Sequence, residues 1–271
     1  MKEKLVEKNI PDYETKTNEI LNYITNDSIE YLKKNQKISE KNLKQLMEIL
    51  KKIDDDMPIQ YIIGKHEFMN MFFTVNCHVF ISSPETEILV KEVIKILQTN
   101  DKLSNILELC TGSGTIAISI AKNVSHVRIL ATDISNEALL VANKNLSLLN
   151  KHKNVKFMQS DLFENVHKKV DLIVANPPYG KSKEIRKKGK NAWKLYEPLI
   201  ARDGGIDGLD HLKNIIFNAY KYLNNGGYLC LEIGHNQKEK IIQLLKDIGI
   251  YKNIYFKKDL EGNDRILICQ I

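Results

Sequence analysis

The chain has 271 residues, of which 43% are hydrophobic and 27% are charged, and its formal net charge is +6. No run of about eighteen apolar residues occurs, so we expect no membrane span, and the N-terminal stretch MKEKLVEKN lacks the apolar core of a secretory signal. The composition therefore predicts a cytoplasmic globular protein, either one large domain or a large domain joined to a small one.

The cysteines are scattered along the chain and form no C-x-x-C pair. They are Cys77, Cys110, Cys230 and Cys269. Such spacing predicts neither a zinc site nor a disulfide framework, and it is typical of a reduced compartment. We expect no metal.

The first part of the chain is predicted to be helical. Apolar residues recur at helical spacing in NEILNYITNDSIEYLKKN (18–35) and in SEKNLKQLMEILKKI (39–53), and Ser39 is a candidate helix cap. Short extended runs follow in residues 59–83. We expect a helical, substrate-recognition domain over residues 1–75 and a linker or hairpin over 76–86.

Residues 87–271 alternate between helical and extended patterns. Strands are predicted at 105–110, 128–134, 155–159, 170–175 and 228–234, and two short strands end the chain. Helices are predicted at 87–98, 115–123, 135–149, 208–223 and 236–248, with Ser135 as the cap of the third and Gly226 and Gly227 closing the fourth. This alternation indicates an α/β domain with an open parallel sheet covered by helices on both faces.

The first strand-to-helix turn has the features of a nucleotide site. In LELCTGSG, Gly112 and Gly114 allow a ligand to come close to the backbone, and the following helix offers free N–H groups. Asp133 ends the next strand, where a carboxylate can accept hydrogen bonds from ribose hydroxyls. Asp161 ends the third strand, and in a site for S-adenosylmethionine Asp161 and Leu162 would lie beside the adenine. This pattern suits either NAD or S-adenosylmethionine, and Asp133 or Asp161 could instead be a helix cap or a turn residue.

The stretch DLIVANPPYG (171–180) separates the two cofactors, because a dehydrogenase has no need of Asn-Pro-Pro-Tyr at a strand end. Methylation of a planar nitrogen benefits from acceptors for both of its N–H groups. The Asn176 side-chain oxygen and the Pro177 carbonyl can supply them, Pro177 and Pro178 restrict the backbone, and Tyr179 offers a flat apolar face. The tetrapeptide predicts nitrogen methylation without saying which nitrogen is methylated.

Taken together, several blocks resemble the bacterial release-factor glutamine methyltransferases, the PrmC/HemK family, over nearly the full length. The matching segments are PIQYIIGKHEF (58–68), PETEILV (84–90), TGSG (111–114), ATDIS (131–135), SDLF (160–163), NPPY (176–179), YEPLIARDGGIDGLDHLKNII (196–216), LEIGHNQ (231–237) and KDLEGNDRI (258–266).

The resemblance implies a Rossmann-like, seven-stranded class I methyltransferase domain over residues 87–271, behind the small helical domain. It implies methyl transfer from S-adenosylmethionine, leaving S-adenosylhomocysteine, to the side-chain amide of the glutamine in the Gly-Gly-Gln loop of release factors. By position, the implied cofactor residues are Cys110, Thr111, Gly112, Ser113, Gly114, Asp133, Asp161, Leu162 and Asn176. The implied catalytic and glutamine-binding residues are Asn176, Pro177, Pro178 and Tyr179.

Two positions depart from the resemblance. Cys110 stands where the family usually has glycine, and Ser82-Ser83 stands where it typically reads Pro-Arg. Three alternatives remain: a paralogue that methylates another amide, an adenine N6-methyltransferase on DNA or RNA, and a binding protein without activity. The basic run 181–194 favours the second. We expect release factors as partners, no direct nucleic-acid binding, and a monomer.

Overall fold

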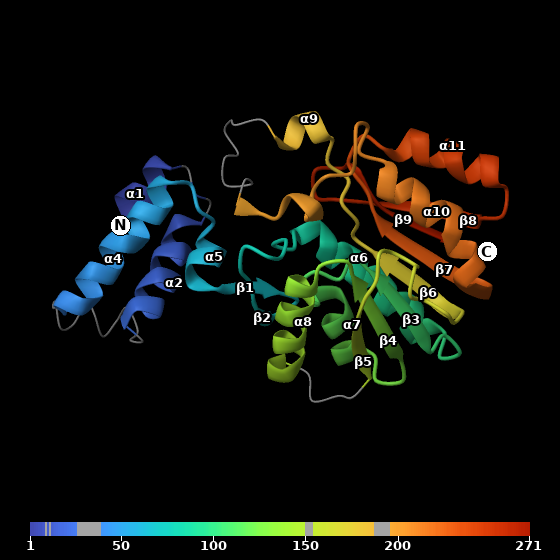
Figure 1. Ribbon diagram of the computed structural model, residues 1–271, viewed down its shortest axis with the longest axis horizontal. Coiled ribbons are helices and arrows are strands. Elements are labelled where there is room, and N and C mark those ends of the chain that lie inside the picture. The colour runs from blue at the N-terminus through green and yellow to red at the C-terminus, as the bar shows by residue number, and fades with distance from the viewer. Residues whose placement is uncertain (9, 11, 26–38, 150–153, 187–195) are drawn as a thin grey trace. The chain divides into compact units, whose positions relative to one another are not determined.

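The computed structural model describes residues 1–8, 10, 12–25, 39–149, 154–186 and 196–271 (Figure 1). These residues form two compact units. One contains Met1–Lys65 together with Tyr196, and the other contains the remaining described residues from His66 onward. Within the described ranges, no helix is both long enough and apolar enough to cross a membrane.

The N-terminal unit is helical, as its periodicity predicts. Its helices are α1 (Lys2–Glu7), α2 (Tyr13–Thr25), α4 (Glu40–Asp54) and α5 (Ile59–Ile63). They bury one apolar cluster formed by Leu5, Ile20, Ile24, Ile49, Ile53, Ile59 and Ile62. The predicted cap is confirmed, because the Ser39 hydroxyl accepts the N–H of Asn42 at 3.2 Å. The second half of the helix expected over 18–35 lies outside the described residues.

A two-stranded sheet follows, made of β1 (Lys65–Phe68) and β2 (Met71–Thr74). The two residues between the strands, Met69 and Asn70, both have positive φ (50° and 57°), which is the geometry of a tight hairpin turn. Phe68, Met71 and Phe73 are buried in the core of the larger unit. The two compact units divide near residue 65, because the hairpin packs with the larger core.

The larger unit is built on a seven-stranded sheet in the order β5-β4-β3-β6-β7-β9-β8. The strands are β3 (Asn105–Leu109), β4 (Arg128–Asp133), β5 (Val155–Gln159), β6 (Val170–Ala175), β7 (Leu223–Glu232), β8 (Lys252–Lys258) and β9 (Asp264–Gln270). Neighbours from β5 to β7 pair in parallel, whereas β9 pairs antiparallel with both β7 and β8. The predicted α/β class is confirmed, with an antiparallel pair added at one edge.

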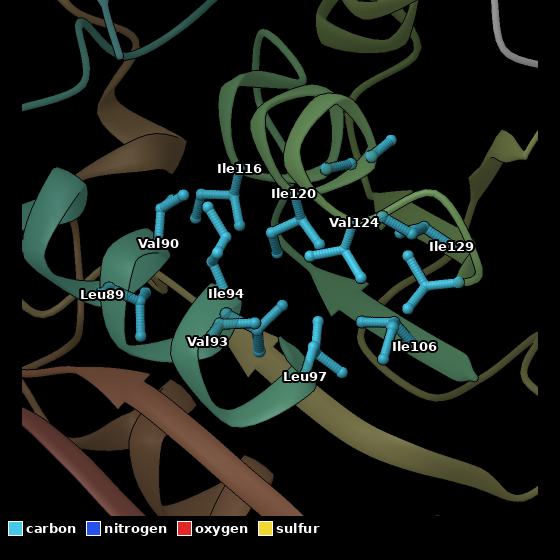
Figure 2. Packing of buried hydrophobic residues seen from close by; sticks show 14 of the residues in the cluster. Leu89, Val90, Val93, Ile94, Leu97, Ile106, Ile116, Ile120, Val124 and Ile129 are labelled. Atoms are coloured by element: carbon cyan, nitrogen blue, oxygen red, sulfur yellow. The ribbon is translucent and has the colours of Figure 1, made fainter. Parts of the chain in front are cut away.

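Helices cover both faces of this sheet (Figure 1). The first layer contains α6 (Pro84–Thr99), α7 (Thr115–Asn123) and α8 (Asn136–Leu149), and the second contains α10 (Asp210–Tyr222) and α11 (Lys238–Ile248). Alternate residues of each buried strand serve the two layers: Ile106 packs under α6 and α7, and Leu107 packs on the opposite side. Figure 2 shows the first core, where side chains of α6 and α7 meet Ile106 and Ile129.

Two short elements complete the unit, the helix α9 (Ser182–Ile185) and the 3₁₀ turn η2 (Leu199–Ala201). One strand begins earlier than predicted. β7 starts at Leu223, before the glycines expected to close the preceding helix, because Leu223 is fully buried and pairs with Val170. The extra residues cause a shift in register between Val170 and Leu172.

A buried asparagine on α8 joins the hairpin to the glycine-rich turn. The Asn145 side-chain oxygen accepts the N–H of Thr74 at 2.7 Å, and its nitrogen donates to the carbonyls of Thr74 (3.0 Å) and Ser113 (2.9 Å). Asn145 is fully buried, so its loss would leave these backbone groups without their hydrogen-bond partner in a largely buried region.

We predict that Asn145→Ala lowers the free energy of unfolding by about 2–4 kcal/mol, because buried backbone groups left unpaired cost about 1–3 kcal/mol each. Urea denaturation measures this loss. The control is Asn143→Ala, on the same helix, where an exposed side chain donates to the Leu139 carbonyl within the helix. That change should stay within about 0.5 kcal/mol of the parent. Equal losses in the two variants would contradict the role given to Asn145.

Candidate active site

The candidate site lies at the carboxyl ends of adjacent parallel strands. β3 pairs with β4 on one side and with β6 on the other, so the chain leaves β3 for one half of the sheet and later returns to fill the other half. Such a switch point leaves a crevice between the loops that follow the two central strands. The glycine-rich turn follows β3, Asp133 is the last residue of β4, and Asn176 directly follows β6.

The turn after β3 has a left-handed backbone at three positions. Cys110, Gly112 and Gly114 have φ of 57°, 55° and 81°. A Cβ atom at Gly112 would meet nothing within 4 Å, so the turn is open on that side, whereas one at Gly114 would lie 2.9 Å from the Phe157 ring. Gly114 thus lets the turn pack closely on β5, and Gly112 leaves space for a ligand.

Asp133 is held against this turn by two backbone donors. Its carboxylate accepts the N–H of Gly112 at 2.8 Å and that of Ser135 at 2.9 Å. Burial raises the pKa of the Asp133 carboxyl above its ordinary value, although the N–H groups of Ser135 and Gly112 act against that rise. The Ser135 hydroxyl caps α8 as predicted, accepting the N–H of Ala138 at 3.1 Å. Asp133 therefore braces the glycine turn from the neighbouring strand.

The other residues of the turn are mostly enclosed. Thr111 and Ser113 are buried, and Cys110 is half-buried. Burial raises the pKa of the Cys110 thiol, and the nearby Asp133 carboxylate raises it further. Because thiolate formation is disfavoured, Cys110 is unsuited to act as a nucleophile.

Asp161 and Leu162 follow β5, next to β4. The N–H of Ser160 donates to the Asp133 carbonyl at 2.9 Å, which brings the two strand ends together. Asp161 is exposed, whereas Leu162 is buried with a φ of 44°. The Ser160 hydroxyl donates to the Leu162 carbonyl at 3.0 Å and supports this conformation.

The Asn-Pro-Pro-Tyr segment begins directly after the buried β6, with Pro177 and Pro178 buried. The Asn176 side-chain nitrogen donates to the Thr86 hydroxyl at 3.0 Å. The Tyr179 hydroxyl donates to Glu232 at 2.9 Å and accepts from Arg265 at 2.8 Å. Burial raises the pKa of the Tyr179 phenol well above its ordinary value, and the Glu232 charge adds to the rise, so the phenol keeps its proton.

The sequence patterns predict no role for three further residues of the site, although all three lie in segments that carry the resemblance: Thr86, Glu232 and Arg265. Glu232 ends β7 and is fully buried, Thr86 is in the first turn of α6, and Arg265 is in β9. A signal did exist, because an acidic residue inside the apolar run YLCLEIG needs buried partners. Their identity depends on strands and helices that are distant in sequence.

The segment after η2 holds the backbone of Tyr179 and Gly180. The N–H of Gly180 donates to the Arg202 carbonyl (2.9 Å), and that of Gly204 donates to the Gly180 carbonyl (2.8 Å). The buried Gln237 side chain donates to the carbonyls of Tyr179 (3.2 Å) and Gly208 (2.9 Å). These contacts fix the loop after the tetrapeptide from the side of α10 and α11.

Ser82 and Ser83, which stand where the resemblance leads us to expect Pro-Arg, lie directly before α6. The buried Ser82 hydroxyl lies 2.8 Å from the Thr115 hydroxyl at the start of α7, and its carbonyl lies 2.8 Å from His66 Nε2. Ser83 forms the N-cap position of α6. Serine therefore joins the segment before α6 to the helix that follows the glycine turn.

Only the first part of the basic run 181–194 belongs to the described residues. There, Lys181 pairs with Glu184 at 3.4 Å, and Arg186 pairs with Asp203 at 3.5 Å. Residues 187–195, including Trp193, lie outside the described part of the chain.

The fold and this strand-end site together define a class I methyltransferase. A sequence profile of the methyltransferase small domain matches residues 82–197. The structure of a ribosomal protein L11 methylase from Lactobacillus delbrueckii subsp. bulgaricus superimposes with a TM-score of 0.52 at 23% identity. The match covers 70% of this chain and 80% of that chain, and it supports the fold alone.

Sequence relatives define the family. A release factor glutamine methyltransferase of Thermodesulfovibrio yellowstonii is 39% identical over 90% of this chain and 87% of its own length. One from Clostridium acetobutylicum is 37% identical over 86% of this chain and 81% of its own. The chain belongs to the release factor glutamine methyltransferase family.

We predict that Gly208→Ala destabilises the loop around Tyr179. Gly208 has a φ of 76°, and a Cβ atom there would collide with the Tyr179 carbonyl oxygen. The matched control is Gly226→Ala, with a φ of 75° and open space around the Cβ position. The control should cost about 1–2 kcal/mol for its left-handed backbone. Gly208→Ala should cost at least about 1 kcal/mol more by urea denaturation, and equal costs would show that Gly208 does not pack tightly against Tyr179.

Proposed function

We propose that this chain transfers a methyl group from S-adenosylmethionine to the side-chain amide nitrogen of the glutamine in the Gly-Gly-Gln loop of peptide-chain release factors. The observation that carries the proposal is the direction of the Asn176 amide. The side-chain nitrogen of Asn176 donates a hydrogen bond to the Thr86 hydroxyl, so the side-chain oxygen is left as an acceptor at the strand-end site. Family membership supports the choice of acceptor.

The residues around the glycine turn fit S-adenosylmethionine. The open side of Gly112 permits close approach to the backbone, and the N-terminus of α7 offers N–H groups. The Asp133 carboxylate accepts the N–H groups of Gly112 and Ser135, and its remaining lone pairs would accept hydrogen bonds from the ribose hydroxyls. Asp161 and Leu162 would flank the adenine. Asn176 would border both cofactor and acceptor. When bound, the cofactor supplies an electrophilic methyl group on a sulfonium.

The tetrapeptide has the groups that an amide acceptor needs. The lone pair of a carboxamide nitrogen is delocalised, so the nitrogen is a weak nucleophile. The Asn176 oxygen and the Pro177 carbonyl would accept its two N–H groups and stabilise the positive charge that develops on the nitrogen during attack. The hydrogen bonds of the Tyr179 hydroxyl to Glu232 and Arg265 hold the phenol in place. The flat face of its ring would then lie against the planar amide of the acceptor. Neither proline has an N–H that could compete for these acceptors.

The proposed partner is a release factor. We propose that this chain acts on it in the cytoplasm and as a monomer. Within the described residues, the N-terminal helical unit contains none of the groups assigned to the chemistry above. We assign it to recognition of the release factor, the role expected for the first domain.

Methyl transfer from a labelled donor to a purified release factor tests the proposal. Label should enter the factor and should disappear when the Gly-Gly-Gln glutamine of the factor is replaced by glutamate. Asn176→Ala removes one of the two acceptors, so turnover should fall on the order of a hundredfold or more with little change in cofactor affinity. DNA, RNA and free glutamine are the competing acceptors. Label on adenine, with an unlabelled factor, would reject the proposed acceptor.

A second prediction concerns the cofactor half of the site. Asp133→Ala should weaken S-adenosylmethionine binding by about 1–3 kcal/mol, the typical contribution of hydrogen bonds to a charged group. Isothermal titration calorimetry measures the change, and NAD should not bind. The matched control is Asp171→Ala. Asp171 lies at the amino end of β6, away from the site, and its carboxylate accepts the N–H groups of Ser104 and Asn105. The control should lose stability but not affinity. Unchanged affinity in Asp133→Ala would return Asp133 to a purely structural role.

A further inference from the structure

The side chains behind the tetrapeptide converge on one buried carboxylate. Glu232 is 0% exposed. Its Oε2 accepts the Thr86 hydroxyl at 2.7 Å, its Oε1 accepts the Tyr179 hydroxyl at 2.9 Å, and the Arg265 guanidinium lies 3.6 Å away. Burial raises the pKa of the Glu232 carboxyl, and the Thr86 and Tyr179 hydroxyls and the Arg265 charge oppose the rise by stabilising the carboxylate.

The hydrogen bonds around Glu232 run in one direction. A hydroxyl has a single proton, and the proton of Thr86 is used in its bond to the carboxylate. Thr86 can therefore only accept from Asn176, which it does from the side-chain nitrogen at 3.0 Å. The same reasoning holds for Tyr179, whose oxygen accepts from Arg265 and whose proton goes to Glu232.

This direction determines which end of the Asn176 amide is available. The amide has an oxygen on one side and an NH₂ group on the other, and the NH₂ group is held at Thr86. Within the described ranges, no hydrogen bond reaches the Asn176 oxygen. Were Thr86 free to donate, the amide could turn and present NH₂ to the N–H groups of an acceptor, which would repel them.

We propose that Glu232 is a positioning residue that acts through Thr86 to fix the Asn176 amide with its oxygen toward the acceptor nitrogen. The inference rests on the proposed function, because it takes the acceptor to be an N–H-bearing amide. It assigns the first turn of α6 to acceptor selection rather than to packing alone. It also gives Arg265 a part, since its bond to Tyr179 directs the phenol proton to Glu232.

The test compares Thr86→Val, which keeps the shape and loses the hydroxyl, with Thr86→Ser, which keeps the hydroxyl. Thr86→Val and Glu232→Gln should each lower kcat about 30- to 100-fold, the order of loss expected for a misplaced catalytic contact. The Kd for S-adenosylmethionine should stay within about twofold, because neither side chain belongs to the cofactor set. Thr86→Ser should be at least about tenfold faster than Thr86→Val.

Two further measurements separate positioning from stability. The double variant Thr86→Val/Glu232→Gln should be no slower than the slower single variant, because both changes break the same chain of hydrogen bonds. The exposed Thr99 at the end of the same helix donates to the Lys95 and Ile96 carbonyls within α6, so Thr99→Val should leave kcat unchanged. Equal rates for Thr86→Ser and Thr86→Val, or additive losses in the double variant, would overturn the proposal. If Glu232→Gln does not fold, the comparison of Thr86→Val with Thr86→Ser still tests the proposal.

An NMR measurement keeps this inference separate from the proposed function. A wild-type enzyme inert on release factors would reject the acceptor but would leave the Asn176 amide to be examined directly. Its side-chain NH₂ resonances, assigned by their loss in Asn176→Ala, should be protected from exchange in wild type and in Thr86→Ser. Protection should be lost in Thr86→Val and in Glu232→Gln. Unchanged protection in all variants would show that Glu232 and Thr86 do not orient the amide.

Discussion

The position of β3 between β4 and β6 is the constraint on which the site depends. Ile106 is in register with Ile129 on one side and with Leu172 on the other, so all three strands end at the same edge. Parallel pairing then brings the glycine turn, Asp133 and Asn176 together although they are far apart in sequence. The two helical layers hold this register, because a shift of one residue would turn Ile106 and Leu107 to the wrong cores.

Two buried carboxyl groups support the two halves of this edge. Glu108 in β3 accepts the N–H of Ala117 in α7 at 2.9 Å, and burial raises its pKa to about 8. Glu232 in β7 holds Thr86 and Tyr179. Each is fully buried beside apolar residues of its strand, and each accepts a hydrogen bond from the first turn of a helix. The first group holds the start of α7, which follows the turn assigned to the cofactor, and the second holds Thr86 and Tyr179 beside Asn176.

The serines before α6 help to connect the two halves. Where the family typically reads Pro-Arg, the Ser82 hydroxyl contacts Thr115 directly after the glycine turn, and Thr86 lies one helical turn further on. The start of α6 therefore contacts α7 at one residue and Asn176 at another. The guanidinium that lies over the Tyr179 ring, 5.7 Å from its centre, comes from Arg265 in β9. An arginine at position 83, as in the expected Pro-Arg, is therefore not needed to place a guanidinium over the Tyr179 ring.

The sequence by itself determined the α/β class, the order of elements, the caps Ser39 and Ser135, and the strand-end positions of Gly112, Asp133 and Asn176. These follow from periodicity, glycine placement and capping chemistry, which act over a few residues. Only the tertiary structure decided that the hairpin belongs to the larger core, that β9 runs antiparallel, and that Thr86, Tyr179, Glu232 and Arg265 meet behind Asn176. Their hydrogen bonds join α6, β7 and β9, and no local pattern records which distant partners a buried charge will find.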